Sequence, residues 1–198
     1  MDYQEFAQVL NKHIFYGNKR ELLDKLASNP ERFIGLFRPS KPSTKILQHL
    51  LQSYEIRMGD ALEEIIGLVI QGQGYSLIDK NIQGENNEIL RLDQYFTDGK
   101  KYYFIEQKIR DDHDSTKKRG QMQNFEKKLN ALYREHGSNL VGIMYFIDPD
   151  FSKNKNYYQE KYGYLEANMS KLSFICSTAS NCLNILELPI FGTKCSDG

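Results

Sequence analysis

The sequence predicts an α/β fold with a mixed sheet, in which a helix, three strands, a second helix and a further strand follow one another along the chain. Three observations support this prediction. Apolar residues recur at helical spacing through the first 72 residues, and short strand-like segments separated by turns follow between residues 75 and 108. After a long amphipathic segment comes Leu140–Ile147, a nearly continuous apolar run of strand length. An α-β-β-β-α-β core, flanked by helices and preceded by an N-terminal helical region, accommodates this order.

The N-terminal region is expected to consist of helices. Asn18 is expected to cap the second helix, and Asn29-Pro30 is expected to end it, because the residue before a proline disfavours the helical conformation. The first helix is indicated by four apolar residues at helical spacing, Phe6, Val9, Leu10 and Ile14.

Two further helices are expected before the strands. One begins at Ser43 or Thr44, after a loop that contains two prolines. The other covers about residues 59–71 and is stopped by Gly72 and Gly74, since glycine is common just beyond a helix end.

Three strands are expected in the middle of the chain, with turns at residues 84–87 and 97–100 between them. The expected strands are Tyr75–Ile82, Ile89–Asp93 and Lys101–Lys108. A polar segment follows, and Ser115 or Thr116 is then expected to cap a long helix that ends near His136.

The segment Leu140–Ile147 is expected to be a buried strand. A right-handed helical crossover would make it the parallel neighbour of the strand that contains Glu106. The remaining segments are less regular. Residues 154–164 are expected to be helix or loop, Leu172–Cys176 a short strand, and residues 181–188 either helix or strand.

Two carboxylates and a lysine are expected to meet at the end of the central hairpin. If Leu90–Asp93 pairs antiparallel with Tyr102–Glu106, Asp93 lies beside Glu106, and strand alternation places Glu106 and Lys108 on one face. Carboxylate oxygens suit a hard divalent cation, and an ammonium group can activate a water or stabilise charge on a phosphodiester. The hairpin is therefore a candidate site for metal-assisted phosphodiester hydrolysis. The alternative is a solvated ion network, which stabilises little.

Composition and charge are those of an ordinary globular domain. The 198 residues suit one domain, with an N-terminal helical subregion expected at 1–53, a catalytic core at 54–147 and a C-terminal completion at 148–198. Lys plus Arg and Asp plus Glu both number 26, so the balanced charge argues only mildly against a nucleic-acid partner. The three cysteines lack the spacing of a zinc site or a disulfide framework. No signal peptide or membrane span is recognisable, so a cytoplasmic protein is expected.

The spacing of the charged residues resembles a known nuclease signature. Asp93, twelve intervening residues and then Glu106-x-Lys108 on a strand are similar to the PD-(D/E)XK pattern. The segment 108–121 resembles the downstream part of type II restriction endonucleases within that superfamily. The chain departs from the pattern at Leu92, where a proline is written in the signature but is often absent.

This resemblance covers roughly residues 57–147 and implies a restriction-endonuclease-like core. It implies a Mg²⁺-dependent enzyme that cuts double-stranded DNA at a short specific sequence and leaves 5′-phosphates, with Asp93 and Glu106 as metal ligands and Lys108 as the catalytic lysine. It also implies a homodimer, because a palindromic site matches two-fold protein symmetry. Two alternatives stay open: a structure-selective repair or recombination nuclease of the same superfamily, and a non-catalytic DNA-binding module.

A third acidic ligand is expected from the helix before the hairpin. Arg57-Met-Gly-Asp-Ala-Leu-Glu63 resembles the R-x-G-x-x-x-E pattern found in that helix of many restriction enzymes. By this resemblance, Glu63 would be a metal or water ligand and Arg57 would contact a DNA phosphate. The alternative is a helix with its polar face in water, and Glu64 is an equally plausible surface acid.

The segment from Lys108 to Lys128 is locally basic, with seven Lys and Arg residues against four Asp and Glu residues. Three of the cations occupy the first turn of the expected helix, where the helix dipole favours acidic residues. Phosphate binding would explain cations at this position, and a glutamine there could read a base edge. The alternative is a solvated helix start. The expected DNA-binding residues are Arg57, Lys117, Lys118, Arg119 and Gln121.

Overall fold

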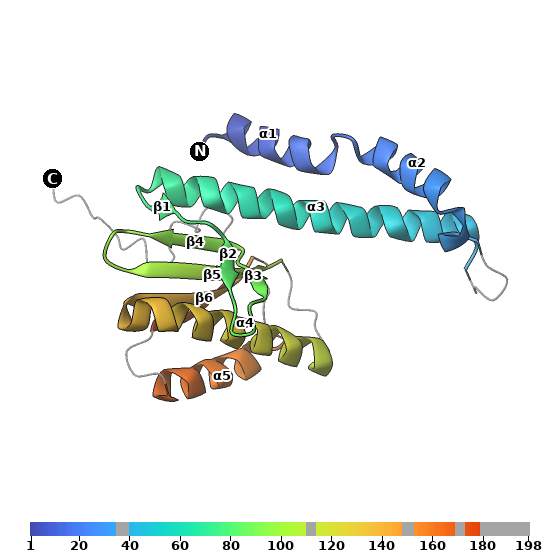
Figure 1. Cartoon of the computed structure of the whole chain (residues 1–198). Coiled ribbons are helices and arrows are strands. Elements are labelled where there is room, and N and C mark those ends of the chain that lie inside the picture. Colours follow the sequence, from blue (N-terminus) through green and yellow to red (C-terminus); the bar gives the residue numbers. More distant parts are fainter. Residues whose placement is uncertain (35–39, 110–113, 148–152, 169–172, 179–198) are drawn as a thin grey trace. The chain divides into compact units, whose positions relative to one another are not determined.

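The structure is a computed structural model that describes five stretches of the chain, residues 1–34, 40–109, 114–147, 153–168 and 173–178. The chain forms two compact units, residues 1–65 and residues 66–198. The described part of the first unit is helical, and the second contains the sheet (Figure 1).

The N-terminal unit contains two short helices and most of a long one. Its elements are α1 (Tyr3–Ile14), α2 (Asn18–Ser28), the 3-10 helix η1 (Pro30–Arg32) and α3 (Pro42–Gly72) as far as residue 65. A capping box starts α1, because the Asp2 carboxylate accepts a hydrogen bond from the Glu5 N–H and the Glu5 carboxylate accepts one from the Asp2 N–H. The predicted cap of α2 is wrong: Gly17, with a left-handed φ of 75°, is the N-cap residue, and Asn18 is the first helical residue.

The helix α3 is continuous, whereas the sequence predicts two helices there. The predicted starts at Ser43 or Thr44 and at Gly59 belong to one helix that begins at Pro42. The residues between the two predicted helices contain no proline, and a single internal glycine costs only about 1 kcal/mol, so nothing interrupts the helix. Its end at Gly72 agrees with the prediction.

The second unit is built on a five-stranded mixed sheet with the order β1-β4-β5-β6-β7. The strands are β1 (Ser76–Leu77), β4 (Gln94–Thr97), β5 (Tyr102–Lys108), β6 (Leu140–Phe146) and β7 (Ser173–Thr178). β1, β4 and β5 are antiparallel neighbours, whereas β5, β6 and β7 are parallel. The predicted parallel pairing of the Glu106 strand with the Leu140 strand is therefore confirmed. The end of α3, the three antiparallel strands, the next helix and β6 follow the predicted α-β-β-β-α-β order.

The strands before residue 97 differ from the prediction. The predicted strand Tyr75–Ile82 is divided into β1 and β2 (Asn81–Gln83), and β2 pairs with β3 (Ile89–Arg91) in a separate two-stranded sheet. The break lies at Asp79, whose carboxylate accepts hydrogen bonds from the backbone N–H of Asn81 at 2.9 Å and from its side-chain amide at 3.1 Å. The strand β4, which pairs with β5, is not predicted from the sequence.

Helices cover both faces of the large sheet. On one face α4 (Ser115–His136) and α5 (Lys155–Asn168) enclose the larger apolar cluster, and Figure 1 shows these two helices on the same side of the strands. On the other face, the last turns of α3 contribute Ile66 and Ile70 to a second cluster with residues of β4, β5 and β6. The sheet is thus buried on both sides, which explains the fully buried Leu140–Phe146 strand.

The helix α4 confirms the long helix predicted to end near His136, but its cap differs from the prediction. Asp114 is the N-cap residue in place of Ser115 or Thr116, and its carboxylate accepts hydrogen bonds from the N–H groups of Thr116 at 3.0 Å and Lys117 at 2.8 Å. The hydrogen bond from the Lys117 N–H is the main reason that the pKa of Asp114 lies below its ordinary value. A charged carboxylate at the cap offsets the unfavourable placement of cations in the first turn.

The C-terminal elements agree with the prediction where the structure describes them. α5 selects the helical alternative for residues 154–164, and β7 overlaps the predicted strand Leu172–Cys176. The expected element at residues 181–188 lies outside the described residues. Within the described stretches, no helix has the length and apolar character needed to cross a membrane.

Candidate functional site

Asp93 lies where the chain passes from the small sheet to the large one. Leu92 is fully buried, and its N–H donates a hydrogen bond to the carbonyl of Lys80 at 2.8 Å, next to the β2–β3 pair. Gln94 begins β4 and lies opposite Ile105 of β5. Asp93 is therefore held between two anchored residues at the end of the β4–β5 ladder.

The Asp93 side chain extends this ladder beyond its last backbone pair. Its Oδ2 accepts a hydrogen bond from the backbone N–H of Gln107 at 2.6 Å, a position where a longer β4 would offer a carbonyl. The predicted pairing of Leu90–Asp93 with Tyr102–Glu106 is wrong, because β3 pairs with β2 and β4 pairs with β5. Asp93 still reaches the Glu106 end of β5, since β4 follows it directly.

Glu106 and Lys108 lie on the same face of β5, as strand alternation predicts. Lys108 Nζ donates a hydrogen bond to Glu106 Oε1 at 2.9 Å and lies 4.0 Å from Asp93 Oδ2. Gln107 points to the opposite face, where its side-chain oxygen accepts a hydrogen bond from the Gln94 amide at 2.8 Å. The lysine thus lies between the two carboxylates.

A second lysine, which the spacing of the charged residues does not predict to be in the site, contacts the other oxygen of Glu106. Lys128 of α4 donates from Nζ to Glu106 Oε2 at 2.6 Å, and each of these two side chains is only 6% exposed. The sequence contains a signal for this contact, since Lys128 lies between Phe125 and Leu129 on the buried face of α4. A lysine at a buried helix position is almost always paired with an acid.

The ionised carboxylate of Asp93 is unfavourably buried. Burial raises the pKa of its carboxyl group from 3.8 to about 6, and the negative charge of Glu106 acts in the same direction. The positive charge of Lys108, the hydrogen bond from the Gln107 N–H and the charge of Lys128 oppose this shift. A further positive charge beside Asp93 would favour its ionised form.

The carboxylates of Asp93 and Glu106 form a donor set that fits a hard divalent cation. Mg²⁺ is commonly bound by one or two protein carboxylates, while water and substrate fill its other positions. The raised pKa of Asp93 agrees with this fit, because a cation beside the pair would favour the ionised form that burial disfavours. Among the residues that the structure describes, no group of three or more His, Cys, Asp or Glu side chains is arranged to hold a metal.

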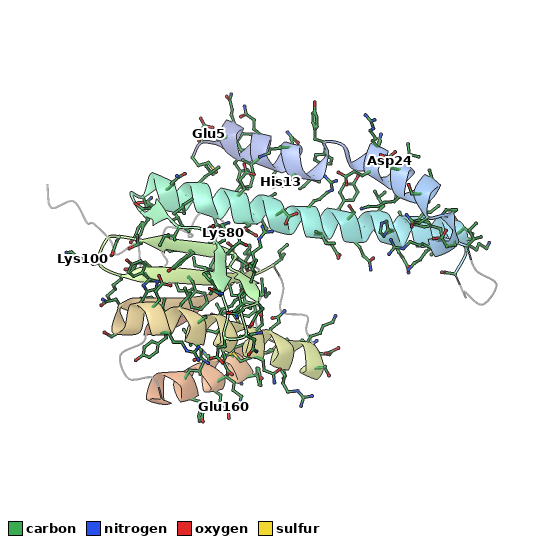
Figure 2. The ribbon with its side chains drawn as sticks, in the orientation of Figure 1. Glu5, His13, Asp24, Lys80, Lys100 and Glu160 are labelled. Carbon is green, nitrogen blue, oxygen red and sulfur yellow. The ribbon has the colours of Figure 1, made fainter. Side chains whose placement is uncertain are left out.

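Two predicted site residues, Arg57 and Glu63, belong to the N-terminal unit, and their roles stay predictions. The guanidinium of Arg57 donates a hydrogen bond to the carbonyl of His13 at 2.8 Å and pairs with the Glu21 carboxylate at 2.6 Å, so it joins α3 to α1 and α2. Glu63 is partly buried on α3. The alternative acid, Glu64, pairs at 2.5 Å with His13, which is labelled on α1 in Figure 2.

The three predicted DNA-binding cations of α4 differ in their surroundings. The side chains of Lys117 and Arg119 are exposed. Lys118 is partly buried against α5: its Nζ donates a hydrogen bond to Asn154 Oδ1 at 3.2 Å and lies 4.6 Å from the ring centroid of Tyr157. Lys118 therefore contributes to the packing of two helices, and the two exposed cations are the better candidates for a phosphate contact.

The predicted base-reading residue, Gln121, also contacts α5. Its side-chain oxygen accepts a hydrogen bond from the hydroxyl group of Tyr158 at 3.3 Å, and the Tyr158 ring packs against Phe146 of β6. The segment 110–113, which leads from β5 to α4, lies outside the described residues. Contact of Gln121 with DNA stays a prediction.

A family model with the description "Type II restriction endonuclease, HinfI" matches the chain in two overlapping parts, residues 2–91 and residues 75–176. Together they cover most of the 198 residues. The second part contains Asp93, Glu106, Lys108 and Lys128. No significant match is found among curated proteins or among solved structures.

Proposed function

Because the chain belongs to the HinfI family of type II restriction endonucleases, and is therefore a site-specific DNA hydrolase, we propose that Asp93, Glu106 and Lys108 form its catalytic centre. The observation that carries this proposal is the position of Lys108 Nζ, 2.9 Å from Glu106 Oε1 and 4.0 Å from Asp93 Oδ2. The family does not support the two alternatives raised by the sequence, a structure-selective repair nuclease and a non-catalytic DNA-binding module.

The proposed cofactor is Mg²⁺, with Asp93 and Glu106 as its carboxylate ligands. When bound, Mg²⁺ acidifies a water molecule and offsets negative charge on the phosphate. The hydrogen bond from the Gln107 N–H fixes the orientation of the Asp93 carboxylate, which would hold the cation. The backbone carbonyl of Gln107 and the carboxylate of Glu63 are proposed as further ligands.

Lys108 is proposed to orient the attacking water and to stabilise the negative charge that develops on the phosphate in the transition state. Its ammonium group is held by Glu106, so little reorganisation is needed when the phosphate is bound. This arrangement assigns metal binding to the two acids and phosphate stabilisation to the lysine.

Replacing Lys108 with alanine is expected to lower the single-turnover cleavage rate by about 10²- to 10³-fold, because a donor aimed at the developing charge is lost. Affinity for DNA, measured with Ca²⁺ in place of Mg²⁺, is expected to stay within about threefold of wild type, because phosphate contacts elsewhere supply most of the binding. The control variant is Lys100→Ala. Lys100, which is labelled in Figure 2, is exposed in the β4–β5 turn, and its variant is expected to cleave at the wild-type rate. A Lys108→Ala enzyme that cleaves like this control would exclude the assigned role.

The proposed function is tested by incubating the purified protein with unmethylated phage DNA and Mg²⁺, with a parallel sample in EDTA. Discrete fragments that appear only with Mg²⁺ are expected, and end mapping should give a short recognition sequence with 5′-phosphates at the cut. Fragments that persist in EDTA would overturn the proposed metal requirement. A smear without defined ends would overturn the proposed reading of a short sequence.

Lys117 and Arg119 are proposed to contact DNA phosphates. Replacing both with alanine is expected to weaken DNA binding and to lower the slope of log affinity against log salt concentration by up to about 2, or about 1 per lost phosphate contact. Lys127→Ala is the matched control, because Lys127 is an exposed cation of the same helix that lies beyond its first turns, where it pairs with Glu88 at 2.7 Å. An unchanged slope in the double variant would remove this pair from the interface.

A homodimer on double-stranded DNA is proposed, because a short palindromic site presents the same surface twice. The proposal predicts two protomers per DNA duplex in sedimentation experiments with Ca²⁺. The cytoplasm is the proposed location, because the DNA to be cut would be found there.

A further inference from the structure

Lys128 is the most deeply buried cation of the candidate site. It extends from the apolar face of α4, where Phe125 and Leu129 are fully buried on either side of it. Its Nζ lies 2.6 Å from Glu106 Oε2, inside the sheet face that α4 covers. It therefore reaches the centre from the helix side, whereas Lys108 reaches it along β5.

Stability alone does not explain a lysine at this position. Transfer of an ammonium group and a carboxylate out of water costs several kcal/mol per ion, and a buried ion pair is often no more stable than apolar residues of the same volume. A methionine or leucine would continue the apolar stripe of α4 at lower cost. A role in the site is a reason to keep the charge.

The two oxygens of Glu106 have separate partners. Oε2 accepts a hydrogen bond from Lys128 and Oε1 accepts one from Lys108 at 2.9 Å. Lys128 is fixed by the packing of α4, because only 6% of its side chain is exposed. Lys108 is more accessible, with 22% of its side chain exposed, and it lies on the side of Asp93.

We propose that Lys128 is a positioning residue of the catalytic centre, a built-in counter-ion that holds Oε2 of Glu106 and turns Oε1 toward Asp93 and the bound cation. This proposal rests on the proposed function, because it assumes that Glu106 binds the metal. Lys128 restricts Glu106 to one metal-binding oxygen, and its charge opposes that of the divalent cation. Lys128 therefore lowers the affinity of the site for the metal but fixes the orientation of the Glu106 ligand.

The test compares Lys128→Met with wild type in two measurements. Calorimetric titration with Ca²⁺, which involves no turnover, should show about three- to tenfold tighter binding in the variant, because a positive charge near the site is removed. Single-turnover cleavage at saturating Mg²⁺ should nevertheless fall by about 10- to 100-fold, as is usual when the partner of a metal ligand is lost. The KM for DNA should stay at the wild-type value.

Tighter Ca²⁺ binding together with slower cleavage is a result that damage to the fold does not produce. Lys127→Met, one residue away on the exposed side of α4, is the matched control and should behave as wild type in both measurements. Lys128→Arg retains a cation and should return Ca²⁺ affinity toward the wild-type value. Unchanged or weaker Ca²⁺ binding in a folded Lys128→Met protein, or cleavage at the wild-type rate, would overturn the proposal.

If Lys128→Met does not fold, Lys128→Gln is measured in the same way, and failure of both neutral variants to fold would give Lys128 a purely structural role and overturn the proposal. If Asp93→Asn cleaves DNA at the wild-type rate, the proposed function itself fails, whatever the Lys128 variants do. If only the Lys128 variants match wild type, the catalytic centre stands and the positioning role alone is lost.

Discussion

Asp93→Asn is expected to lower DNA cleavage by about a thousandfold or more and, at the same time, to raise the stability of the metal-free protein. The loss of cleavage follows from the loss of a charged metal ligand. DNA binding in Ca²⁺ is expected to persist, because it depends mainly on contacts to phosphates elsewhere. The asparagine side-chain oxygen can still accept the hydrogen bond from the Gln107 N–H, so the local fold is retained.

The gain in stability follows from the raised pKa of Asp93, which is about 6 in the folded protein against 3.8 ordinarily. The folded state holds its proton more tightly than the unfolded state, so this group favours folding fully below pH 3.8 and loses that contribution as the pH rises through about 6. Above that range the ionised carboxylate leaves the protein less stable, by about 3 kcal/mol, than a neutral group in its place would. Asparagine is neutral at every pH, and the variant should therefore be the more stable protein at pH 8 and equal to wild type near pH 4.

Urea denaturation in EDTA at pH 4, 6 and 8 measures this difference. Asp98→Asn is the control of opposite sign, because hydrogen bonds from the backbone, that of the Lys101 N–H first, lower the pKa of Asp98. That variant should lose stability at pH 8. Equal stability of wild type and Asp93→Asn at all three pH values would contradict the proposed cost of burying the ionised Asp93 carboxylate.

Glu106→Ala should lower the cleavage rate about as much as Asp93→Asn does. Its effect on the stability of the metal-free protein should be the opposite, a loss. Glu106 is 5% exposed and accepts hydrogen bonds from Lys108 and Lys128. Removing the acid leaves Lys128 buried without its partner, which is expected to cost about 3–5 kcal/mol. Of the two acids at one site, one therefore opposes folding of the metal-free protein and the other supports it.

Urea denaturation at pH 8 again provides the measurement, with two comparisons. Glu88→Ala removes an acid that pairs with Lys127 at the surface, and its effect should be much smaller. The double variant Glu106→Ala/Lys128→Met removes both buried charges and should regain part of the stability lost by Glu106→Ala alone. If the double variant is less stable than the single one, the buried pair is not the reason for the loss.

Local patterns were sufficient to predict much of the unit that contains the large sheet. The apolar run at 140–147 and the amphipathic helix before it are each indicated by a pattern of many apolar residues. Alternation along β5 placed Glu106 and Lys108 on one face, because every second residue of a strand points the same way. The acids and the lysine could be selected together because their spacing resembles a nuclease signature. The predicted position of Asp93 near Glu106 was right although its pairing was wrong.

Contacts between distant segments decided the rest. The sequence does not indicate that β3, which ends before Asp93, pairs with β2 and not with β5. The pairing partner of a strand depends on the whole sheet and not on the strand itself. The contacts of Lys118 and Gln121 with α5 are likewise a property of two helices that are separate in the sequence.

The sequence by itself determined which residue types are available for metal-assisted hydrolysis and on which elements most of them lie, since these follow from spacing and periodicity. Only the tertiary structure decided that Lys128 of α4 meets Glu106 of β5, a contact across 22 positions of the chain. A lysine in a helix is normally solvated, and its burial becomes favourable only when packing brings a carboxylate within hydrogen-bonding distance. The apolar stripe of α4 indicates that Lys128 is buried, but only the docking of α4 on the sheet decides which acid it meets.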